Sequence, residues 1–304
     1  MTKIRKPNFL VIGAARSGTT ALCKFLEQHP EVFVSSPKEP HFLAFANQQL
    51  QFAGPGDDVL MNRKAITEFE TYTRLFEAAN GAMALGEGSV STLYYPETAI
   101  PNIQEFCPDA KCIVVLRNPV ERAYSGFLYM IARGFEDVPS FEEALESEDS
   151  RINSNWHHIW HYKRQGMYAK QIKQFQDALG PDKLKIILSE DLKGEATQQT
   201  MSELYEFIGV DPTFQAKTDA EINRSGKPKN KLLHSAMSLL GRNLAIKDML
   251  KAAVPSSVRE RIRSSNLSRP EMSSATRESL TNFFRQEIDD LGPLINRDLG
   301  HWLK

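Results

Sequence analysis

The sequence predicts an α/β fold of three layers, in which a central, largely parallel β-sheet is flanked by helices on both faces. Residues 9–12, 112–116 and 184–188 are short, continuous apolar runs, as expected of strands covered on both sides, and residues 32–34 form a further predicted strand. The segments between and after these runs carry apolar residues every three or four positions, the spacing of a helix with one buried stripe. Such alternation is typical of crossover units stacked into a parallel sheet.

Five segments carry the helical stripe. Their apolar residues are Leu22, Phe25 and Leu26; Val120, Ala123, Tyr124, Phe127, Leu128 and Ile131; Tyr168, Ile172, Phe175 and Leu179; Met201, Leu204, Tyr205 and Ile208; and Leu280, Phe283, Phe284, Ile288 and Leu291. Gly180 and Gly209 directly follow the third and fourth stripes, where a left-handed residue commonly ends a helix. We expect the last helix to end before Gly292-Pro293.

Charge and composition narrow the classes of protein. The chain has 304 residues, with 37 Lys and Arg against 38 Asp and Glu, a formal charge of −1. Hydrophobic residues make up 41%, which is enough for a substantial core and typical of a globular protein. Proteins that hold nucleic acid through its phosphates usually have a clear basic excess, so the balance disfavours a general nucleic-acid binder and still allows a local anion pocket.

We expect one domain over residues 1–304, although the length alone would also fit two. Residues 230–275 are less periodic and rich in Ser, Arg and Lys. This segment is expected to be a linker, a mobile lobe or a substrate-facing insertion, and the sequence does not choose among the three.

The sequence carries no sign of membrane insertion or secretion. Its longest apolar runs fall far short of the roughly 20 residues that span a bilayer, and the start of the chain lacks the apolar stretch and cleavage site of a secretory signal. Cys23, Cys107 and Cys112 are odd in number and lack metal-ligand spacing, which favours a reducing compartment. We therefore expect a cytoplasmic protein; nothing indicates its oligomeric state.

The strongest local pattern is a strand, a loop and a helix in direct succession. The loop is Gly13-Ala14-Ala15-Arg16-Ser17-Gly18-Thr19-Thr20. Gly13 and Gly18 allow torsions that turn successive N–H groups toward one anion, the two threonines add hydroxyl donors, and the helix start adds a favourable dipole. The pattern predicts a P-loop-like phosphate cradle; the alternative is a glycine-bearing tight turn.

The loop departs from the G-x-x-x-x-G-K-[ST] pattern, because Thr19 stands where the lysine for the β and γ phosphates would be. The second strong strand runs into Arg117 rather than into the Asp that holds Mg²⁺ in nucleotide hydrolases. A cation at this place indicates a ligand with an extra phosphate that side chains neutralise. We therefore expect no metal.

Arg117 precedes a helix start, with Asn118 as the N-cap and Pro119 in the first helical position. Ser125 lies about 140° around this helix from Val120, away from the apolar stripe. It can therefore face the sheet edge where Arg117 emerges, and the pair would bind one anion by charge and hydroxyl. Either residue alone would be an ordinary surface Arg or helix-face Ser.

Two segments resemble the cofactor motifs of sulfotransferases that use 3′-phosphoadenosine 5′-phosphosulfate (PAPS). Residues 13–20 resemble the 5′-phosphosulfate loop, and Leu116-Arg117-Asn118-Pro119-Val120-Glu121-Arg122-Ala123-Tyr124-Ser125 resembles the 3′-phosphate motif. The similarity is greatest to the heparan sulfate type and its bacterial relatives, and it covers most of the chain. Further matching segments are Pro37-Lys38-Glu39-Pro40-His41-Phe42, Gly86-Glu87-Gly88-Ser89 and residues 164–168, 223–227 and 298–302.

The resemblance implies a set of cofactor residues. The 5′-phosphosulfate would be held by Arg16, Ser17, Gly18, Thr19 and Thr20, with Arg16 as the loop cation. Arg117 and Ser125 would bind the 3′-phosphate, and Tyr168 would lie near the nucleotide. Arg224, Gly226 and Lys227 match a flexible basic loop that closes over the cofactor. Gly88 departs from the heparan sulfate pattern, which has Lys there, so an acceptor-side contact is either absent or supplied by Lys38.

The resemblance also implies in-line transfer of a sulfuryl group from PAPS to an acceptor hydroxyl, giving a sulfate ester and 3′,5′-adenosine bisphosphate (PAP). Glu39 matches the catalytic glutamate, and a carboxylate can accept the hydroxyl proton if burial raises its pKa toward neutrality. His41 is the rival base, and Glu87 would either orient the phosphate loop or touch the substrate. Arg16 and the loop amides would stabilise charge on the bridging oxygen.

Residues 156–161, Trp-His-His-Ile-Trp-His, place His157 and His161 on one predicted helical face. This is a candidate metal pair, but it lacks the Glu of H-E-x-x-H and a third ligand nearby. We therefore favour an aromatic and polar rim of the acceptor cleft, or packing against Tyr162.

Two other functions use the same loop. A nucleotide-dependent kinase would need Mg·ATP and is disfavoured by Thr19, and a nucleotide-binding regulatory module would have an inactive site. The acceptor stays open among carbohydrate, lipid and small-molecule hydroxyls, with cleft-lining segments expected at residues 42–62, 150–165 and 230–270. If the predicted cations surround one cofactor, the chain has no excess of Lys and Arg left to bind a strongly sulfated polymer. This favours a small or weakly charged acceptor.

Overall fold

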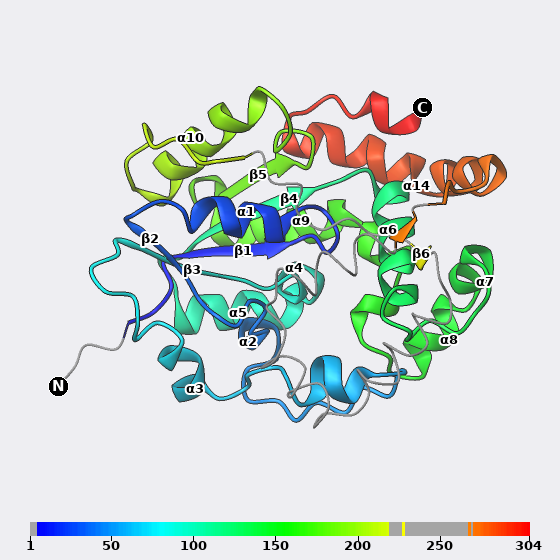
Figure 1. The fold of residues 1–304 in the computed structure, drawn as a ribbon, viewed down its shortest axis with the longest axis horizontal. Helices are drawn as coiled ribbons and strands as arrows, with labels where there is room; N and C mark the ends of the chain where they lie inside the picture. Colours follow the sequence, from blue (N-terminus) through cyan, green and yellow to red (C-terminus); the bar gives the residue numbers. More distant parts are fainter. Residues whose placement is uncertain (1–4, 219–226, 229–266, 269) are drawn as a thin grey trace.

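Five parallel strands form the central sheet in the order β2-β3-β1-β4-β5 (Figure 1). The computed structural model describes residues 5–218, 227–228, 267–268 and 270–304. The strands are β1 (Phe9–Gly13), β2 (Val32–Val34), β3 (Ala84–Gly88), β4 (Lys111–Leu116) and β5 (Leu184–Leu188). Four of them are the predicted strands. The sequence patterns do not predict β3. This strand is fully buried, but its two glycines and one carboxylate interrupt the apolar run that marks the other strands.

Helices cover both faces of this sheet. Their bounds are α1 (Thr19–Leu26), α2 (Phe42–Phe45), η1 (Asp58–Asn62), α3 (Phe69–Arg74), α4 (Ser91–Tyr94), α5 (Pro96–Phe106), α6 (Pro119–Ile131), α7 (Phe141–Glu146), α8 (Glu148–Asn153), η2 (His158–Trp160), η3 (Arg164–Gly166), α9 (Tyr168–Leu179), η4 (Pro181–Lys183), α10 (Ala196–Ile208), α14 (Ser274–Ile295) and η5 (Gly300–Leu303). Lys227–Pro228 (β6) and Leu267–Ser268 (β7) pair as antiparallel strands. None of the helices in the described ranges is both long and apolar enough to cross a membrane.

The five predicted helices correspond to α1, α6, α9, α10 and α14, and one predicted boundary is wrong. α14 continues through Gly292 and Pro293 and ends at Asn296, which has a φ of 53°. Leu291 and Gly292 are buried, so packing of the last turn outweighs the breaking tendency of the Gly-Pro pair. Phe283 is 51% exposed and does not belong to the buried stripe.

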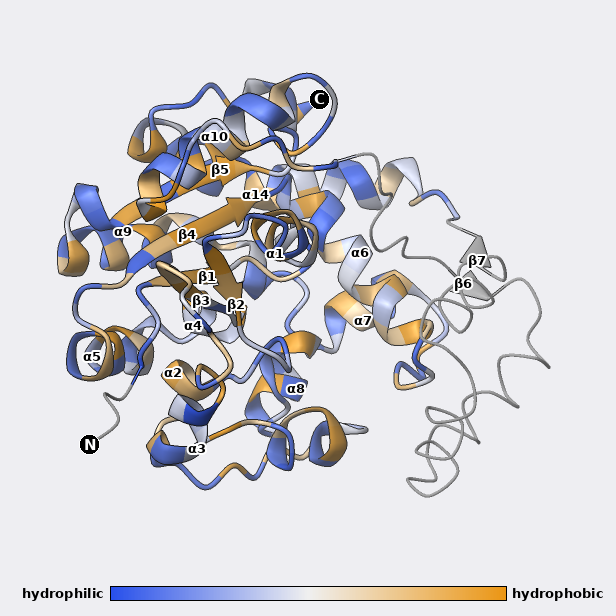
Figure 2. Ribbon diagram, turned by 60° about the vertical axis from the view of Figure 1, so that its left-hand side comes forward, coloured by the Kyte–Doolittle hydropathy of each residue, from blue (hydrophilic) through white to orange (hydrophobic). Residues whose placement is uncertain are grey.

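Alternate side chains of the strands enter two separate cores. Leu10 and Ile12 of β1 pack with α5, α6, α9 and α14 on one face of the sheet, whereas Phe9 and Val11 pack with α1 and α10 on the other. Figure 2 colours the strands as hydrophobic and the helices as mixed, as expected of a sheet covered on both sides. The predicted three-layer fold is confirmed.

The strand order places a ligand site between β1 and β4. From β1 the chain proceeds to β2 and β3 on one side, and β4 then pairs with the opposite side of β1. Ligands of open parallel sheets bind beyond the carboxyl ends of the strands where the order reverses in this way. The loop after β1 and Arg117 after β4 both lie at this point.

Candidate active site

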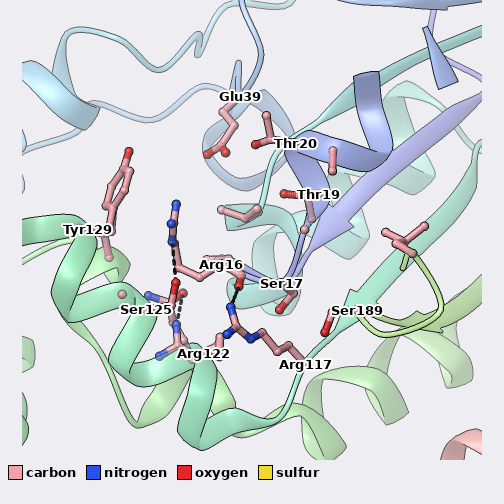
Figure 3. A pocket seen from close by; sticks show the side chains of 18 of the residues that line it. Arg16, Ser17, Thr19, Thr20, Glu39, Arg117, Arg122, Ser125, Tyr129 and Ser189 are labelled. Atoms are coloured by element: carbon pink, nitrogen blue, oxygen red, sulfur yellow. Dashed lines mark hydrogen bonds between the residues drawn. The ribbon is translucent and has the colours of Figure 1, made fainter. Parts of the chain in front are cut away.

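A cavity of about 1220 Å³ opens at the carboxyl ends of the strands (Figure 3). Its walls come from the loop after β1, the segment after β2, the ends of β4 and β5, and α6. The predicted site residues that line it are Arg16, Ser17, Gly18, Thr19, Thr20, Glu39, His41, Arg117 and Ser125. Residues from separate predicted motifs therefore share one space.

The loop after β1 has the form that a phosphate cradle needs. Gly18 is the N-cap of α1 with a φ of 111°, and Arg16 also has a left-handed φ, 66°. This conformation is strained for an arginine, so the surrounding structure must hold it. Gly13 serves another purpose than predicted: an ideal Cβ there would lie 2.6 Å from the Cβ of Leu93, so close packing against α4 requires the glycine.

Arg16 extends from this loop to α6. Its Nε lies 3.4 Å from Ser125 Oγ, and its guanidinium lies over the ring of Tyr129, 4.4 Å from the ring centre (Figure 3). Arg117 Nη1 donates a hydrogen bond to the backbone oxygen of Arg16 at 3.2 Å. The loop cation and the predicted Arg117–Ser125 pair thus form one polar cluster.

The start of α6 agrees with the prediction. Asn118 Oδ1 accepts hydrogen bonds from the N–H groups two and three residues further on, at 2.9 and 3.4 Å. Ser125 is buried and lines the cavity. The carboxylate of Glu121 lies 3.5 Å from Arg117 Nη2, so this guanidinium is held in place from both sides.

Tyr168 lies behind the cavity wall. It is fully buried, and its hydroxyl donates a hydrogen bond to the backbone oxygen of Arg117 at 3.0 Å. The structure thus does not bring Tyr168 to the cavity surface; it supports Arg117 from behind. Arg224 and Gly226 lie outside the described residues, and of Lys227 only the backbone, in β6, is described.

Glu39 and His41 enter the cavity from the segment after β2. Both have a left-handed φ, 65° and 61°, on either side of Pro40. Such strain is common at functional sites, where the surroundings fix an unfavourable backbone. His41 Nε2 lies 3.8 Å from Glu39 Oε2, and His41 Nδ1 shares a hydrogen bond of 2.8 Å with Ser91 Oγ. Both candidate bases therefore face the same space.

The pKa of Glu39 is lowered, not raised. Burial raises this pKa, but the charges of Lys38, His41 and Lys64 outweigh burial and lower it to about 2. The condition that burial raise the pKa of the Glu39 carboxyl toward neutrality is therefore not met, because Lys38 Nζ lies only 3.1 Å from Glu39 Oε1. Burial lowers the pKa of His41 to about 4. At neutral pH the site holds an ionised glutamate and a neutral histidine.

Glu87 on β3 is a buried carboxyl beside the candidate bases, and its pKa is raised. Burial raises its pKa to about 7, against the opposing effects of the Ser89 hydrogen bond and the charge of Lys38. Ser89 Oγ donates to Glu87 Oε2 at 2.7 Å and accepts from the backbone N–H of His41 at 2.9 Å. Glu87 does not line the cavity; it supports the segment that carries the candidate bases.

The histidines of residues 156–161 form part of one cavity wall. His158–Trp160 is a 3₁₀ helix, so the predicted α-helical face shared by His157 and His161 does not exist. His157 and His158 line the cavity, whereas His161 shares a hydrogen bond of 2.5 Å with the Tyr94 hydroxyl. Among the described residues no group of three or more His, Cys, Asp and Glu side chains could hold a metal ion.

Comparison with known proteins decides the family. The family model described as "Sulfotransferase family" matches residues 7–215. The chain belongs to the sulfotransferase family.

The chain matches relatives whose names refer to a heparan sulfate N-sulfotransferase and a carbohydrate sulfotransferase. It is 29% identical over 219 residues to a bifunctional heparan sulfate N-deacetylase/N-sulfotransferase 3 of Mus musculus, covering 69% of this chain and 23% of the relative. It is 27% identical over 270 residues to carbohydrate sulfotransferase 15 of Mus musculus, covering 72% and 46%. The chain thus spans less than half the length of these curated relatives. A crystal structure of a sulfotransferase from Alicyclobacillus acidocaldarius is 30% identical, with a TM-score of 0.77 and coverage of 99% and 100%.

The cavity is also lined by residues that the sequence patterns do not predict. Arg122 is fully buried, lines the cavity, and donates from Nη1 to Gln165 Oε1 at 3.3 Å. Tyr129 carries the guanidinium groups of Arg16 and Arg133, each 4.4 Å from its ring centre. Tyr129 lies one helical turn beyond Ser125, so the helical spacing could have identified it.

The parts of the cavity wall that loops form could not be identified from the sequence in this way. Ser189, Leu192 and Gly194 follow β5 and line the cavity without any recognisable motif. Of the three segments expected to line the acceptor cleft, residues 42–62 and 150–165 both contribute to the wall. Most of the third, residues 230–270, lies outside the described residues.

Proposed function

We propose that this sulfotransferase moves a sulfuryl group from PAPS to an acceptor hydroxyl, giving a sulfate ester and PAP. The observation that carries the proposal is the junction of two anion-binding segments: Arg117 bonds to the Arg16 backbone oxygen at 3.2 Å, and Arg16 Nε lies 3.4 Å from Ser125 Oγ. Two cations and a hydroxyl therefore face one cavity. This donor set suits a nucleotide with anionic groups at both its 5′ and 3′ positions.

Each end of the cofactor has proposed partners. Residues 16–20 would hold the 5′-phosphosulfate, since the α1 start supplies N–H donors and a positive dipole end. Arg117 and Ser125 would hold the 3′-phosphate, with Tyr168 acting through the Arg117 backbone. Arg224, Gly226 and Lys227 remain proposed cofactor residues on the basis of the sequence alone.

PAPS supplies an activated sulfuryl group when it is bound, and the chain supplies the base and the charge stabilisation. Glu39 is ionised at neutral pH and is the proposed acceptor of the hydroxyl proton. Arg16 and the loop N–H groups stabilise the negative charge that develops on the departing 5′-phosphate. His41, neutral and 3.8 Å from Glu39, is the alternative base.

A carbohydrate hydroxyl is the proposed acceptor, because matched relatives are named for heparan sulfate and carbohydrate sulfation. Leu60, Met61 and Ile159 add apolar surface to the acceptor side of the cavity, and His157 and His158 add polar edges. This mixture suits a sugar or another small hydroxyl compound. The formal charge of −1 favours an acceptor that is not a strongly sulfated polymer.

Thermal-shift and calorimetric titrations with PAP, adenosine 5′-phosphosulfate and Mg·ATP test the cofactor. We expect PAP to stabilise the protein most. Adenosine 5′-phosphosulfate lacks the 3′-phosphate, and the predicted motifs lack the lysine and the carboxylate that would match Mg·ATP. Binding at 100 times Kd adds about 2.7 kcal/mol to the free energy of unfolding. Equal stabilisation by PAP and Mg·ATP would overturn the cofactor assignment and favour the kinase.

Incubation with isotopically labelled PAPS and a host extract tests the reaction. We expect mass spectrometry to detect a compound that gains one sulfuryl group, with PAP released in equal amount. Binding of PAP without transfer to any acceptor would favour the inactive regulatory module instead.

A further inference from the structure

Lys38 lies directly beside the proposed base. Its Nζ is 3.1 Å from Glu39 Oε1, and only 23% of its side-chain surface is exposed. The backbone N–H of Glu39 donates to the backbone oxygen of Gly88 at 3.1 Å, so β3 fixes the position of this ion pair. The ammonium is thus held close to the cavity that Glu39 lines.

The glycine at position 88 makes room for this lysine. An ideal Cβ on Gly88 would lie 3.3 Å from Lys38 Cε and 2.8 Å from Cys23 Sγ. A side chain at position 88 would therefore collide with the sulfur and press on the lysine stem. The absence of a side chain at position 88 leaves room for Lys38 to reach Glu39.

This ion pair opposes the role of Glu39 as a base. A carboxylate whose pKa is about 2 accepts a proton poorly from a hydroxyl. The pKa of Lys38 is raised, because the charges of Glu39, Cys23 and Glu87 outweigh the effect of burial. Because Lys38 Nζ lies 3.1 Å from Glu39 Oε1, proton transfer to Glu39 becomes more favourable when the ammonium gains another anionic partner.

We propose that Lys38 is a second cation of sulfuryl transfer. Its ammonium moves from Glu39 to the oxygens of the transferring group, and Glu39 is then free to take the acceptor proton. The inference rests on the proposed sulfuryl-transfer function. The bond from the acceptor oxygen to sulfur forms as the bond from sulfur to the bridging oxygen breaks. The acceptor proton goes to Glu39, and the electron pair of the broken bond stays on the 5′-phosphate.

Kinetics of Lys38→Met and Lys38→Arg test this role, with Lys24→Met on the exposed side of α1 as the matched control. PAP lacks the sulfuryl group, so we expect all three variants to bind PAP within about 3-fold of the unsubstituted protein. We expect kcat of Lys38→Met to fall about 10²- to 10³-fold across the pH range, as on loss of one transition-state donor. Lys38→Arg should recover part of the rate, and Lys24→Met should lose none.

The pH profile separates this role from that of a simple counter-ion. The ionisable and charged groups that face the pair are His41 and Lys64 around Glu39, and Cys23 and Glu87 around Lys38. Without Lys38 the acid limb of kcat/KM moves up toward the usual glutamate pKa in either case. An unchanged kcat above that limb would reduce Lys38 to a counter-ion and overturn the inference.

Two further outcomes are distinct. An equal loss of PAP affinity and rate in folded Lys38→Met, with thermal unfolding as the check, would assign Lys38 to nucleotide binding and also overturn the inference. If the unsubstituted protein neither binds PAP nor transfers sulfuryl groups, the proposed function itself fails.

Discussion

Arg117 Nη1 donates a hydrogen bond to the backbone oxygen of Arg16 at 3.2 Å, which ties the end of β4 to the loop after β1. The carboxylate of Glu121 holds the same guanidinium from the other side at 3.5 Å. The two segments proposed to bind the anionic groups of the cofactor are thereby fixed relative to each other. A ligand that needs both segments loses less freedom on binding to such a preorganised site.

Arg117→Ala should erase the preference for PAP over Mg·ATP. Charge-assisted hydrogen bonds contribute about 1.5–3 kcal/mol, so we expect the Kd for PAP to rise by roughly 10- to 100-fold. Ser125→Ala should weaken PAP by a smaller factor, since it removes a neutral donor. Isothermal titration measures both, with the exposed Arg285→Ala on α14 as the control. A retained preference in Arg117→Ala would show that the extra phosphate binds elsewhere.

Local sequence patterns predicted the features of the fold that depend on residues close together in the sequence. The four predicted strands, the start of α1 after Gly18 and the cap at Asn118 follow from short segments, and each is confirmed. The strand order then explains why Arg16 and Ser125 meet, although 109 positions separate them. β3 escaped prediction because its burial depends on partners on both sides and not on its own composition.

The electrostatics of the site could not be predicted in the same way. Lys38 and Glu39 are adjacent in the sequence, yet their ion pair depends on the left-handed backbone of Glu39 and on the space above Gly88. The cluster of Arg16, Tyr129 and Arg133 likewise depends on how the loop and α6 approach each other. Such contacts between separate elements have no sequence motif.

Glu39→Gln should abolish turnover and leave PAP binding intact. The change removes the proton acceptor but keeps the shape of the side chain, so we expect a loss of about 10²- to 10⁴-fold in kcat. Steady-state kinetics and PAP titration measure the two quantities. Turnover that stays undiminished would assign the base to His41 or Glu87, and His41→Gln is the variant to compare.

The same substitution should change the response of stability to acid. The folded-state pKa of Glu39 is lowered to about 2, so its ionised form stabilises the fold above the ordinary value of 4.5. This contribution is lost as the pH falls from 4.5 toward 2. Glu39→Gln should therefore show a shallower decline of melting temperature over that range, and parallel curves would contradict the ion pair with Lys38.

Glu87→Gln should have the opposite effect at higher pH. The folded-state pKa of Glu87 is raised from 4.5 to about 7, mainly by burial. Its contribution to stability is therefore complete below pH 4.5 and is lost as the pH rises to 7. The loss is on the order of 3 kcal/mol, since one pKa unit corresponds to about 1.4 kcal/mol.

Thermal unfolding of both proteins between pH 4.5 and 8.5 measures this effect. We expect the unsubstituted protein to lose melting temperature across the range relative to Glu87→Gln, whose amide oxygen can still accept from Ser89 Oγ. The Ser89→Ala variant is the control for that hydrogen bond. A constant difference between the two curves would mean that Glu87 does not titrate in this range.

Residues 297–302 join the ends of β4 and β5, which border the cavity. Asn118 Nδ2 donates to the backbone oxygen of Trp302 at 3.0 Å, and Trp302 Nε1 donates to Glu190 Oε1 at 3.0 Å. Arg297 donates two hydrogen bonds to Asp191, at 3.0 and 2.9 Å. Asn118 follows Arg117, and Glu190 follows Ser189, which lines the cavity. This segment therefore holds both walls from outside.

Trp302→Phe should consequently weaken PAP binding without touching the ligand. It keeps an aromatic ring but removes the hydrogen bond to Glu190, and one such bond contributes about 0.5–1.5 kcal/mol, so we expect the Kd for PAP to rise by roughly 3- to 10-fold. Arg297→Ala should act in the same direction through Asp191, and combining the two should add less than the sum because both hold one loop. Titration calorimetry measures the affinities, with Arg285→Ala on the exposed face of α14 as the control. If PAP affinity stays constant while the melting temperature falls, the segment supports the fold alone and does not position Arg117 and Ser189.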